Sequence, residues 1–192
     1  MEQNSEYIRL AADLQEDSIV DGEGIRAVIW TQGCTHNCPG CHNPETHDMR
    51  GGALVDIEEV KQEIRELEGQ DGITFSGGDP MFQVDQCLEL AKTAKECGLN
   101  IWCYTGYTFE ELLEISKKKK EIIEFLKLID VLIDGRFVLS EKSLNLKFRG
   151  SRNQRIIDPQ KSLKKKKAVL IDRLMEEDQG ITSKKIEEEI FI

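Results

Sequence analysis

The sequence contains no apolar run approaching the roughly 18 residues that a membrane-spanning helix requires. Its 26 lysines and arginines are outnumbered by 36 aspartates and glutamates, which gives a net charge of −10. This deficit argues against a broad nucleic-acid surface, because binding phosphates needs clustered surplus cations. The opening residues, MEQNSEYIRL, lack the basic and apolar regions of a secretory signal. We therefore expect a soluble, cytoplasmic protein that binds neither membrane nor nucleic acid.

The cysteines are unevenly spread along the chain. Thiols in a cytoplasmic chain stay reduced, so its six cysteines are better interpreted as metal ligands, reactive thiols or small buried groups than as a disulfide framework. Three fall within eight residues of one another, and the others share no ligand loop, so we expect these others in the core or on helices. The first group is Cys34, Cys38 and Cys41, and the second is Cys87, Cys97 and Cys103.

Strands and helices alternate along the chain. Short β-branched runs that stop at glycine or at the cysteines predict buried strands, and apolar residues at helical spacing predict the helices between them. This order favours parallel strands with helices outside, which can curl into a barrel or an arc of one. We predict an α/β fold, an incomplete TIM-like β/α barrel. The expected strands are 26–31, 72–76, 100–105, 130–134 and a short fifth at 154–158, and the expected helices are 57–67, 83–97 and 108–128.

The composition changes after Pro159. The remaining residues are heavily charged, with apolar residues at helical spacing, so we predict one domain over 1–159 and a charged, helical C-terminal extension over 160–192. Two runs of four lysines, 117–120 and 164–167, fall on predicted helical stretches. Solvated helix faces and a docking patch for an acidic partner are both open interpretations of these runs.

The stretch TQGCTHNCPGCHN, residues 31–43, allows three interpretations of its thiols. Unliganded cysteines usually pack in cores, whereas the glycine, asparagine and proline here predict an irregular loop near solvent. Structural zinc could use His36, His42 or His47 as a fourth ligand, although zinc modules usually take ligand pairs from separate parts of the chain. A 4Fe-4S cluster normally takes four thiolates. Supplying three would leave one iron open to an exchangeable molecule, which indicates chemistry at the cluster.

The complete C-x-x-x-C-x-x-C motif at Cys34, Cys38 and Cys41 resembles that of the radical S-adenosylmethionine enzymes. The segment 18–26 is similar to the N-terminal part of glycyl-radical-enzyme activases, and FSGGDP at 75–80 resembles the family's Gly-Gly-Glu segment. Three further segments resemble activases of the anaerobic ribonucleoside-triphosphate reductase in particular, within a resemblance that covers roughly residues 8–158. They are WCYTGY at 102–107, DVLIDGRF at 130–137 and FRGSRNQR at 148–155.

This resemblance implies an enzyme whose three clustered thiolates hold a 4Fe-4S cluster and whose fourth iron binds S-adenosylmethionine. Reductive cleavage of that molecule would give a radical that abstracts hydrogen from a glycine of the anaerobic reductase, so no catalytic side chain is expected. The reductase is the implied partner, and a flavodoxin or ferredoxin is the implied electron donor. Activases of other glycyl radical enzymes, such as pyruvate formate-lyase, share the cysteine loop. The basic segment 149–155 is open between a cover over the cofactor, a face for the reductase and an ordinary loop.

The resemblance also implies contacts to the cofactor. Gly77 and Gly78 have no Cβ and would let the backbone approach the methionine moiety. Asp79 is one methylene shorter than the family's glutamate, and it would accept a hydrogen bond from the amino group of S-adenosylmethionine. We expect His36 and His47 to face solvent. The implied cofactor-binding positions are Gly40, Cys41, His42, Gly77, Gly78, Asp79 and Thr105.

Overall fold

The computed structural model describes residues 6–176, which form one mixed sheet of eight strands with helices packed on it. The parallel centre of the sheet confirms the predicted α/β class. The strands are β1 (Tyr7–Leu10), β2 (Gln15–Ser18), β3 (Arg26–Thr31), β4 (Ala53–Asp56), β5 (Gly72–Gly77), β6 (Asn100–Tyr104), β7 (Val131–Asp134) and β8 (Arg155–Ile157), of which β3, β5, β6 and β7 are parallel. The other strands are antiparallel: β1 and β2 pair with β3, β4 pairs with β1, and β8 pairs with β7.

The fifth expected strand exists as β8, but it runs antiparallel to β7. The connection between them, residues 135–154, contains one short 3-10 turn and no crossover helix, so the chain returns beside β7 in the opposite direction. The sequence order did not predict this reversal.

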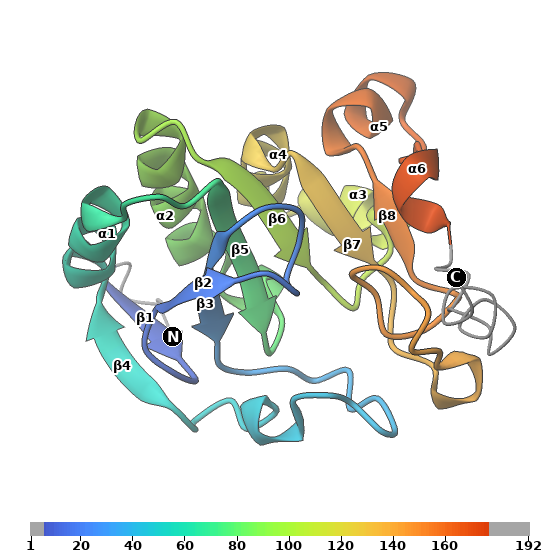
Figure 1. The fold of residues 1–192 in the computed structure, drawn as a ribbon, viewed down its shortest axis with the longest axis horizontal. Helices are drawn as coiled ribbons and strands as arrows, with labels where there is room; N and C mark the ends of the chain where they lie inside the picture. The colour runs from blue at the N-terminus through green and yellow to red at the C-terminus, as the bar shows by residue number, and fades with distance from the viewer. Residues whose placement is uncertain (1–5, 177–192) are drawn as a thin grey trace, which may run out of the picture.

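The sheet is an open arc of a barrel. Its order runs from β4 through β1, β3, β5, β6 and β7 to β8, and the two edge strands do not pair with each other in the described part of the chain. Figure 1 shows the strands fanning across the molecule, with the arrowheads of β3, β5 and β6 directed toward the loop that follows β3. The carboxyl ends of the parallel strands therefore meet at the edge that carries the cysteines.

The helices α1 (Ile57–Glu66), α2 (Val84–Glu96), α3 (Phe109–Ser116) and α4 (Glu121–Leu128) connect the parallel strands. Their apolar faces join the sheet in the larger core cluster, in which Phe75 and Phe125 meet edge to face at 5.2 Å. The single helix expected over 108–128 is in fact two, because the lysine run 117–120 forms the turn between α3 and α4. Asp56 caps α1, and its side chain accepts a hydrogen bond from the Glu58 N–H.

The chain after β8 forms α5 (Pro159–Lys165) and α6 (Asp172–Met175). Leu174 is 2% exposed and belongs to a second core cluster that contains Trp102 and Ile133. The second lysine run straddles the end of α5, where Lys166 adopts a left-handed conformation. Residues 177–192 of the predicted helical extension lie outside the described part of the chain.

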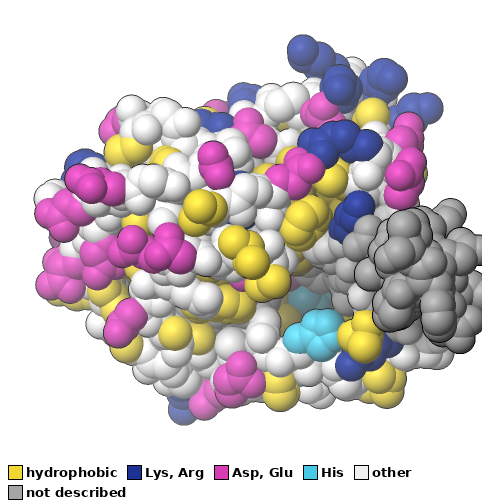
Figure 2. Space-filling view, viewed as in Figure 1, with side chains coloured by type: hydrophobic (Ala, Val, Ile, Leu, Met, Phe, Trp, Pro, Cys, Tyr) yellow, Lys and Arg dark blue, Asp and Glu magenta, His cyan; other side chains and the backbone are white. Residues whose placement is uncertain are grey.

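Charge is unevenly distributed over the surface. Figure 2 shows acidic side chains gathered over the side that carries α1, and lysine and arginine side chains around α5. Among the residues that the structure describes, no helix has both the length and the apolar character needed to cross a membrane.

Candidate functional site

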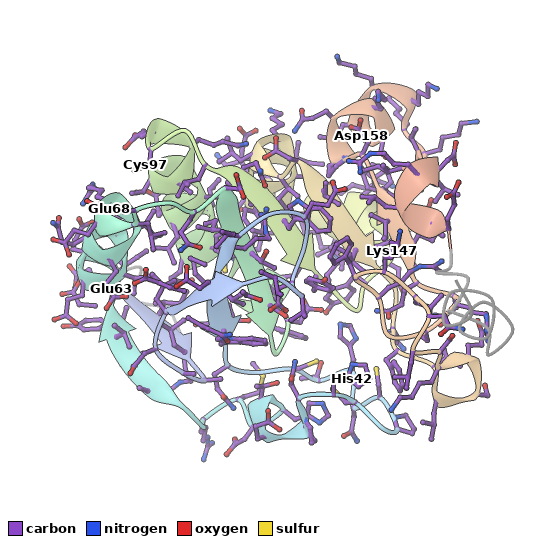
Figure 3. All side chains as sticks on the ribbon, viewed as in Figure 1. His42, Glu63, Glu68, Cys97, Lys147 and Asp158 are labelled. Carbon is purple, nitrogen blue, oxygen red and sulfur yellow. The ribbon has the colours of Figure 1, made fainter. Side chains whose placement is uncertain are left out.

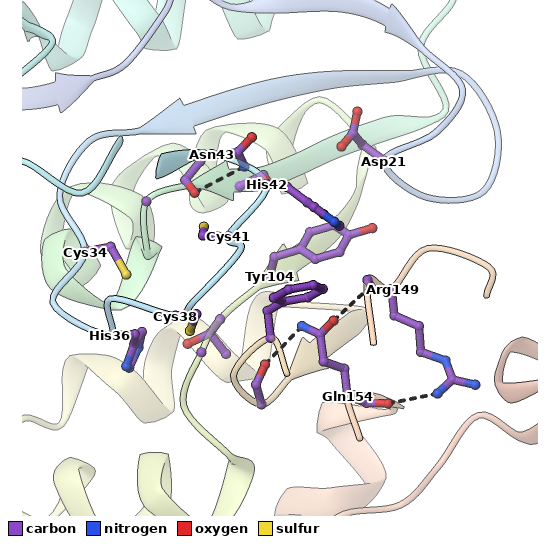
Figure 4. Close-up of a pocket in the computed structure, with 18 of the residues that line it drawn as sticks. Asp21, Cys34, His36, Cys38, Cys41, His42, Asn43, Tyr104, Arg149 and Gln154 are labelled. Carbon is purple, nitrogen blue, oxygen red and sulfur yellow. Dashed lines mark hydrogen bonds between the residues drawn. The ribbon is translucent and has the colours of Figure 1, made fainter. Parts of the chain in front are cut away.

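A cavity of about 400 Å³ lies at the carboxyl ends of the parallel strands (Figure 4). One wall is the loop between β3 and β4, which contains all three clustered cysteines. The ends of β5, β6 and β7 form its floor, and residues 146–154 form the opposite wall. In Figure 3, His42 lies on this side of the molecule and Cys97 on the far side, at the end of α2.

Cys34, Cys38 and Cys41 are half-buried free thiols that line the cavity together. The loop that carries them is closed at its base, where the N–H groups of Gly33 and Cys34 donate to the carbonyls of Thr46 and His47. Within the loop, the Cys41 N–H donates to the Cys38 carbonyl at 3.1 Å. Main-chain bonds thus hold an otherwise irregular segment, and they bring three thiols that are close in sequence to one cavity.

Burial makes two of these thiols, Cys34 and Cys38, weaker acids than usual before any metal binds. Loss of solvent raises the pKa of Cys34 to about 11, and the nearby Asp79 carboxylate acts in the same direction. Burial also raises the pKa of Cys38. Since metals bind the thiolate, loading the site releases protons.

The three thiols form a donor set that suits an iron–sulfur cluster. Among the described residues, no three histidine, cysteine, aspartate or glutamate side chains converge closely enough to hold one metal ion. A four-iron cube is wider than one ion and takes its thiolates at separate corners. Three thiols spaced around one cavity fit that requirement, and the cavity extends beyond them to β5 and β6.

Gly77 and Gly78 line the cavity as the resemblance implied. The structure adds a second reason for glycine here. Gly77 has φ +97°, and a Cβ on it would lie 2.5 Å from the Thr31 carbonyl oxygen. A Cβ on Gly78 would lie 2.5 Å from the Gly33 carbonyl oxygen. The end of β5 therefore touches the chain that leads into the cysteine loop, and the Gly78 N–H donates to Thr31 at 2.7 Å.

Asp79 is 1% exposed, and its carboxylate does not line the cavity. Its oxygens accept hydrogen bonds from the Thr105 hydroxyl, the Gly106 N–H, the Met81 N–H and the His36 imidazole. Every one of these donors belongs to the protein.

The expectation that His36 faces solvent is wrong. Its side chain is 5% exposed, its Nε2 lies 2.7 Å from Asp79 Oδ2, and its ring stands edge-on to Tyr107 at 4.5 Å. His47 is only half-buried. Nothing local in the sequence separates these two histidines, because the partner of His36 lies 43 residues away along the chain.

The other implied positions are distributed around the cavity. Thr105 lines it, although its hydroxyl donates to Asp79. His42 lines it from an exposed position, with its ring 4.9 Å from that of Phe137 (Figure 4). Gly40 is exposed beside Leu139 and does not line it. The structure thus brings together most of the implied residues, namely Cys34, Cys38, Cys41, His42, Gly77, Gly78 and Thr105.

The wall at 146–154 contributes residues that received no individual role from the sequence. Gln154 accepts from the Gly150 N–H at 2.9 Å and donates to the Gly135 carbonyl at 3.0 Å. Arg149 donates to the carbonyls of Arg152 and Gln154. The segment is therefore an ordered wall, and the cluster of arginine and glutamine in FRGSRNQR was the only signal for it in the sequence.

Comparisons with known proteins agree with this site. A family model described as a 4Fe-4S single cluster domain matches residues 20–157. The anaerobic ribonucleoside-triphosphate reductase-activating protein of Haemophilus influenzae is 36% identical over 144 residues, covering 71% of this chain and 89% of the relative. Those of phage T4 and Escherichia coli K12 are 36% and 37% identical, over 71% of this chain and 86% and 90% of the relatives.

Among solved structures, QueE from Escherichia coli aligns with a TM-score of 0.42 and 13% identity over 56% of this chain and 59% of that chain. The sequence relatives are much closer, and they match nearly their whole length. A three-thiol loop over a cavity, a 4Fe-4S domain that spans most of the sheet and these relatives lead to one family: the chain belongs to the anaerobic ribonucleoside-triphosphate reductase-activating proteins.

Proposed function

We propose that this protein activates an anaerobic ribonucleoside-triphosphate reductase by generating a glycyl radical on it, with Cys34, Cys38 and Cys41 holding a 4Fe-4S cluster. The observation that carries the proposal is a set of three thiols that line a cavity also lined by Gly77 and Gly78, so that a cluster and a small molecule fit side by side. A 4Fe-4S cluster held by these three thiols would supply the one electron needed to cleave S-adenosylmethionine, and the radical so formed would take hydrogen from a glycine of the partner.

The chain's own residues bind, orient and shield. Once deprotonated, the three thiols would hold the cluster at the cavity wall formed by the cysteine loop. The main chain at Gly77 and Gly78 lines the cavity and would be the surface against which the methionine part of S-adenosylmethionine lies. Aromatic side chains of Trp30, Tyr104 and Phe148 line the cavity and give it apolar surface.

The electron donor is a flavodoxin or ferredoxin, acting in the cytoplasm. Support comes from the exposure of the cysteine loop: Thr35, Asn37, Pro39 and Gly40 are all exposed, so a donor can approach the cluster from outside without entering the cavity. The boundary at 159 between the domain and a C-terminal extension stays a prediction.

The test is anaerobic reconstitution with iron and sulfide, followed by reduction, addition of S-adenosylmethionine and mixing with the reductase. We expect a brown protein, release of 5′-deoxyadenosine and a glycyl radical doublet by electron paramagnetic resonance. Cys38→Ala should abolish all three, whereas Cys97→Ala, at an exposed thiol distant from the site, should not. A colourless, zinc-loaded protein would refute the proposal. A radical that appears on a pyruvate formate-lyase and not on the reductase would reassign the partner.

A further inference from the structure

The carboxylate of Asp79 joins three separate parts of the chain. It accepts from the Met81 N–H at 3.0 Å, in the 3-10 turn that follows β5. It also accepts from the Thr105 hydroxyl at 3.0 Å and the Gly106 N–H at 2.9 Å, both after β6. The remaining donor is His36 Nε2 at 2.7 Å, from the cysteine loop. A carboxylate offers about four lone-pair positions. The protein's own four donors therefore occupy it.

The His36 ring, which makes the fourth of these bonds, is enclosed by neighbouring residues. Its ring stands 4.5 Å from that of Tyr107 and 5.9 Å from that of Phe82. Gly106 packs directly on the imidazole, and a Cβ at that position would overlap it. Because the histidine side chain is 5% exposed and the aspartate 1%, the bond between them is protected from water.

His36 is two residues from Cys34 and two from Cys38. Fixing its side chain against β5 and β6 therefore limits the movement of both thiols relative to Gly77 and Gly78. The backbone supports the same contact, since the Asp79 N–H donates to the Gly33 carbonyl at 3.0 Å.

We propose that Asp79 is a positioning residue that holds the cysteine loop through His36, and that it does not bind S-adenosylmethionine. This rests on the proposed function, in that it takes the loop as the cluster site. The Asp79 carboxylate, which corresponds to the glutamate of the family's Gly-Gly-Glu segment, points away from the cavity. Of that segment, only Gly77 and Gly78 line the cavity.

A double-mutant cycle tests this proposal. The variants are His36→Leu, Asp79→Asn and the two combined, with His36→Gln as the conservative form that keeps a donor near the position of Nε2. Thr35→Ala, at an exposed neighbour in the same loop, is the matched control. Two measurements are made on each: urea unfolding of the metal-free chain, and S-adenosylmethionine affinity together with the electron paramagnetic resonance spectrum of the reduced, reconstituted protein.

In the metal-free chain we expect each single change to lower the folding equilibrium constant about tenfold or more, as loss of a buried charge-assisted hydrogen bond does. The double variant should fall little further than either single one, because the two residues act as a unit. In the reconstituted protein, both single variants should weaken S-adenosylmethionine binding to a similar extent. Both should also broaden the electron paramagnetic resonance signal observed after S-adenosylmethionine is added. His36→Gln should recover most of both losses, and Thr35→Ala should behave as wild type.

Additive effects of the two single changes would overturn the proposal. An Asp79→Asn variant that loses S-adenosylmethionine affinity while His36→Leu keeps it would also overturn it, and would make Asp79 a ligand. The metal-free measurement separates this failure from failure of the proposed function. If wild type forms no cluster, the function is wrong, yet unfolding still reports whether the two residues are coupled. If they are uncoupled there, the positioning role is wrong even in an active enzyme.

Discussion

Replacing Gly78 with alanine tests how closely the ends of β3 and β5 must meet for the site to form. The added Cβ would lie 2.5 Å from the Gly33 carbonyl oxygen and 2.9 Å from its carbon and nitrogen. These are backbone atoms that cannot rotate away, so the base of the cysteine loop must shift, and such overpacking costs about 1–3 kcal/mol. Gly77→Ala adds a left-handed conformation, worth about 1–2 kcal/mol, to a similar overlap with Thr31, so we expect about 2–5 kcal/mol.

The control is Gly98→Ala, where φ is +79° and no atom lies within 4 Å of the added Cβ. It isolates the conformational cost of about 1–2 kcal/mol. Urea unfolding of the metal-free proteins measures all three changes, and iron bound after reconstitution measures their effect on the site. We expect Gly77→Ala and Gly78→Ala to lower iron content, and Gly98→Ala to leave it unchanged. A Gly78→Ala protein with wild-type stability and iron content would refute this account of the contact.

Three further changes have defined outcomes. Arg155→Met leaves Asp134, which is 0% exposed, without its 2.5 Å ion pair, and should cost about 3 kcal/mol in urea unfolding, a loss that Asp134→Asn in the same chain should partly restore. Leu174→Ala should cost about 2–5 kcal/mol by opening a cavity in the second core cluster, and a change below 1 kcal/mol would mean that α6 is not packed as described. Burial raises the pKa of Cys34 to about 11 from an ordinary 9.0, so the metal-free thiol is protonated below that pH. Near pH 8 it has about 100-fold less thiolate than a thiol with the ordinary pKa, and it should react with iodoacetamide faster as pH rises. The exposed Cys97 should be labelled first, as peptide mapping can determine.

Much of the central sheet could be predicted from the sequence, because its strands are short apolar runs that end at glycine or at the cysteine loop. The edge strands could not. β2 reads QEDS and has no apolar alternation, so its pairing with β3 comes from tertiary contact. The direction of β8 was also hidden, since local sequence specifies a strand but not which way its neighbour runs. The break between α3 and α4 falls in a lysine run whose composition suits a helix.

The site divides in the same way. Cys34, Cys38 and Cys41 were found because ligands on one loop have a spacing that sequence displays directly. The burial of His36 depends on Asp79 and Tyr107, which come from other strand ends, and no local pattern reports it. The motif likewise identified Asp79 as a polar group next to the glycines, but the direction of its side chain depends on donors from three segments.

Helix α6 connects to both flanks of the cavity. Arg173 pairs with Glu23 in the segment before β3, with Nη2 2.6 Å from Oε2, and the Met175 carbonyl accepts from Arg149 at 2.6 Å. Arg173 and Met175 lie beyond the stretch that the family model matches, which ends at 157. A protein shortened to end at residue 157 would lose the contacts of α6 to both flanks of the cavity. Any minimal protein used for spectroscopy or crystallisation should therefore retain the chain at least through Met175.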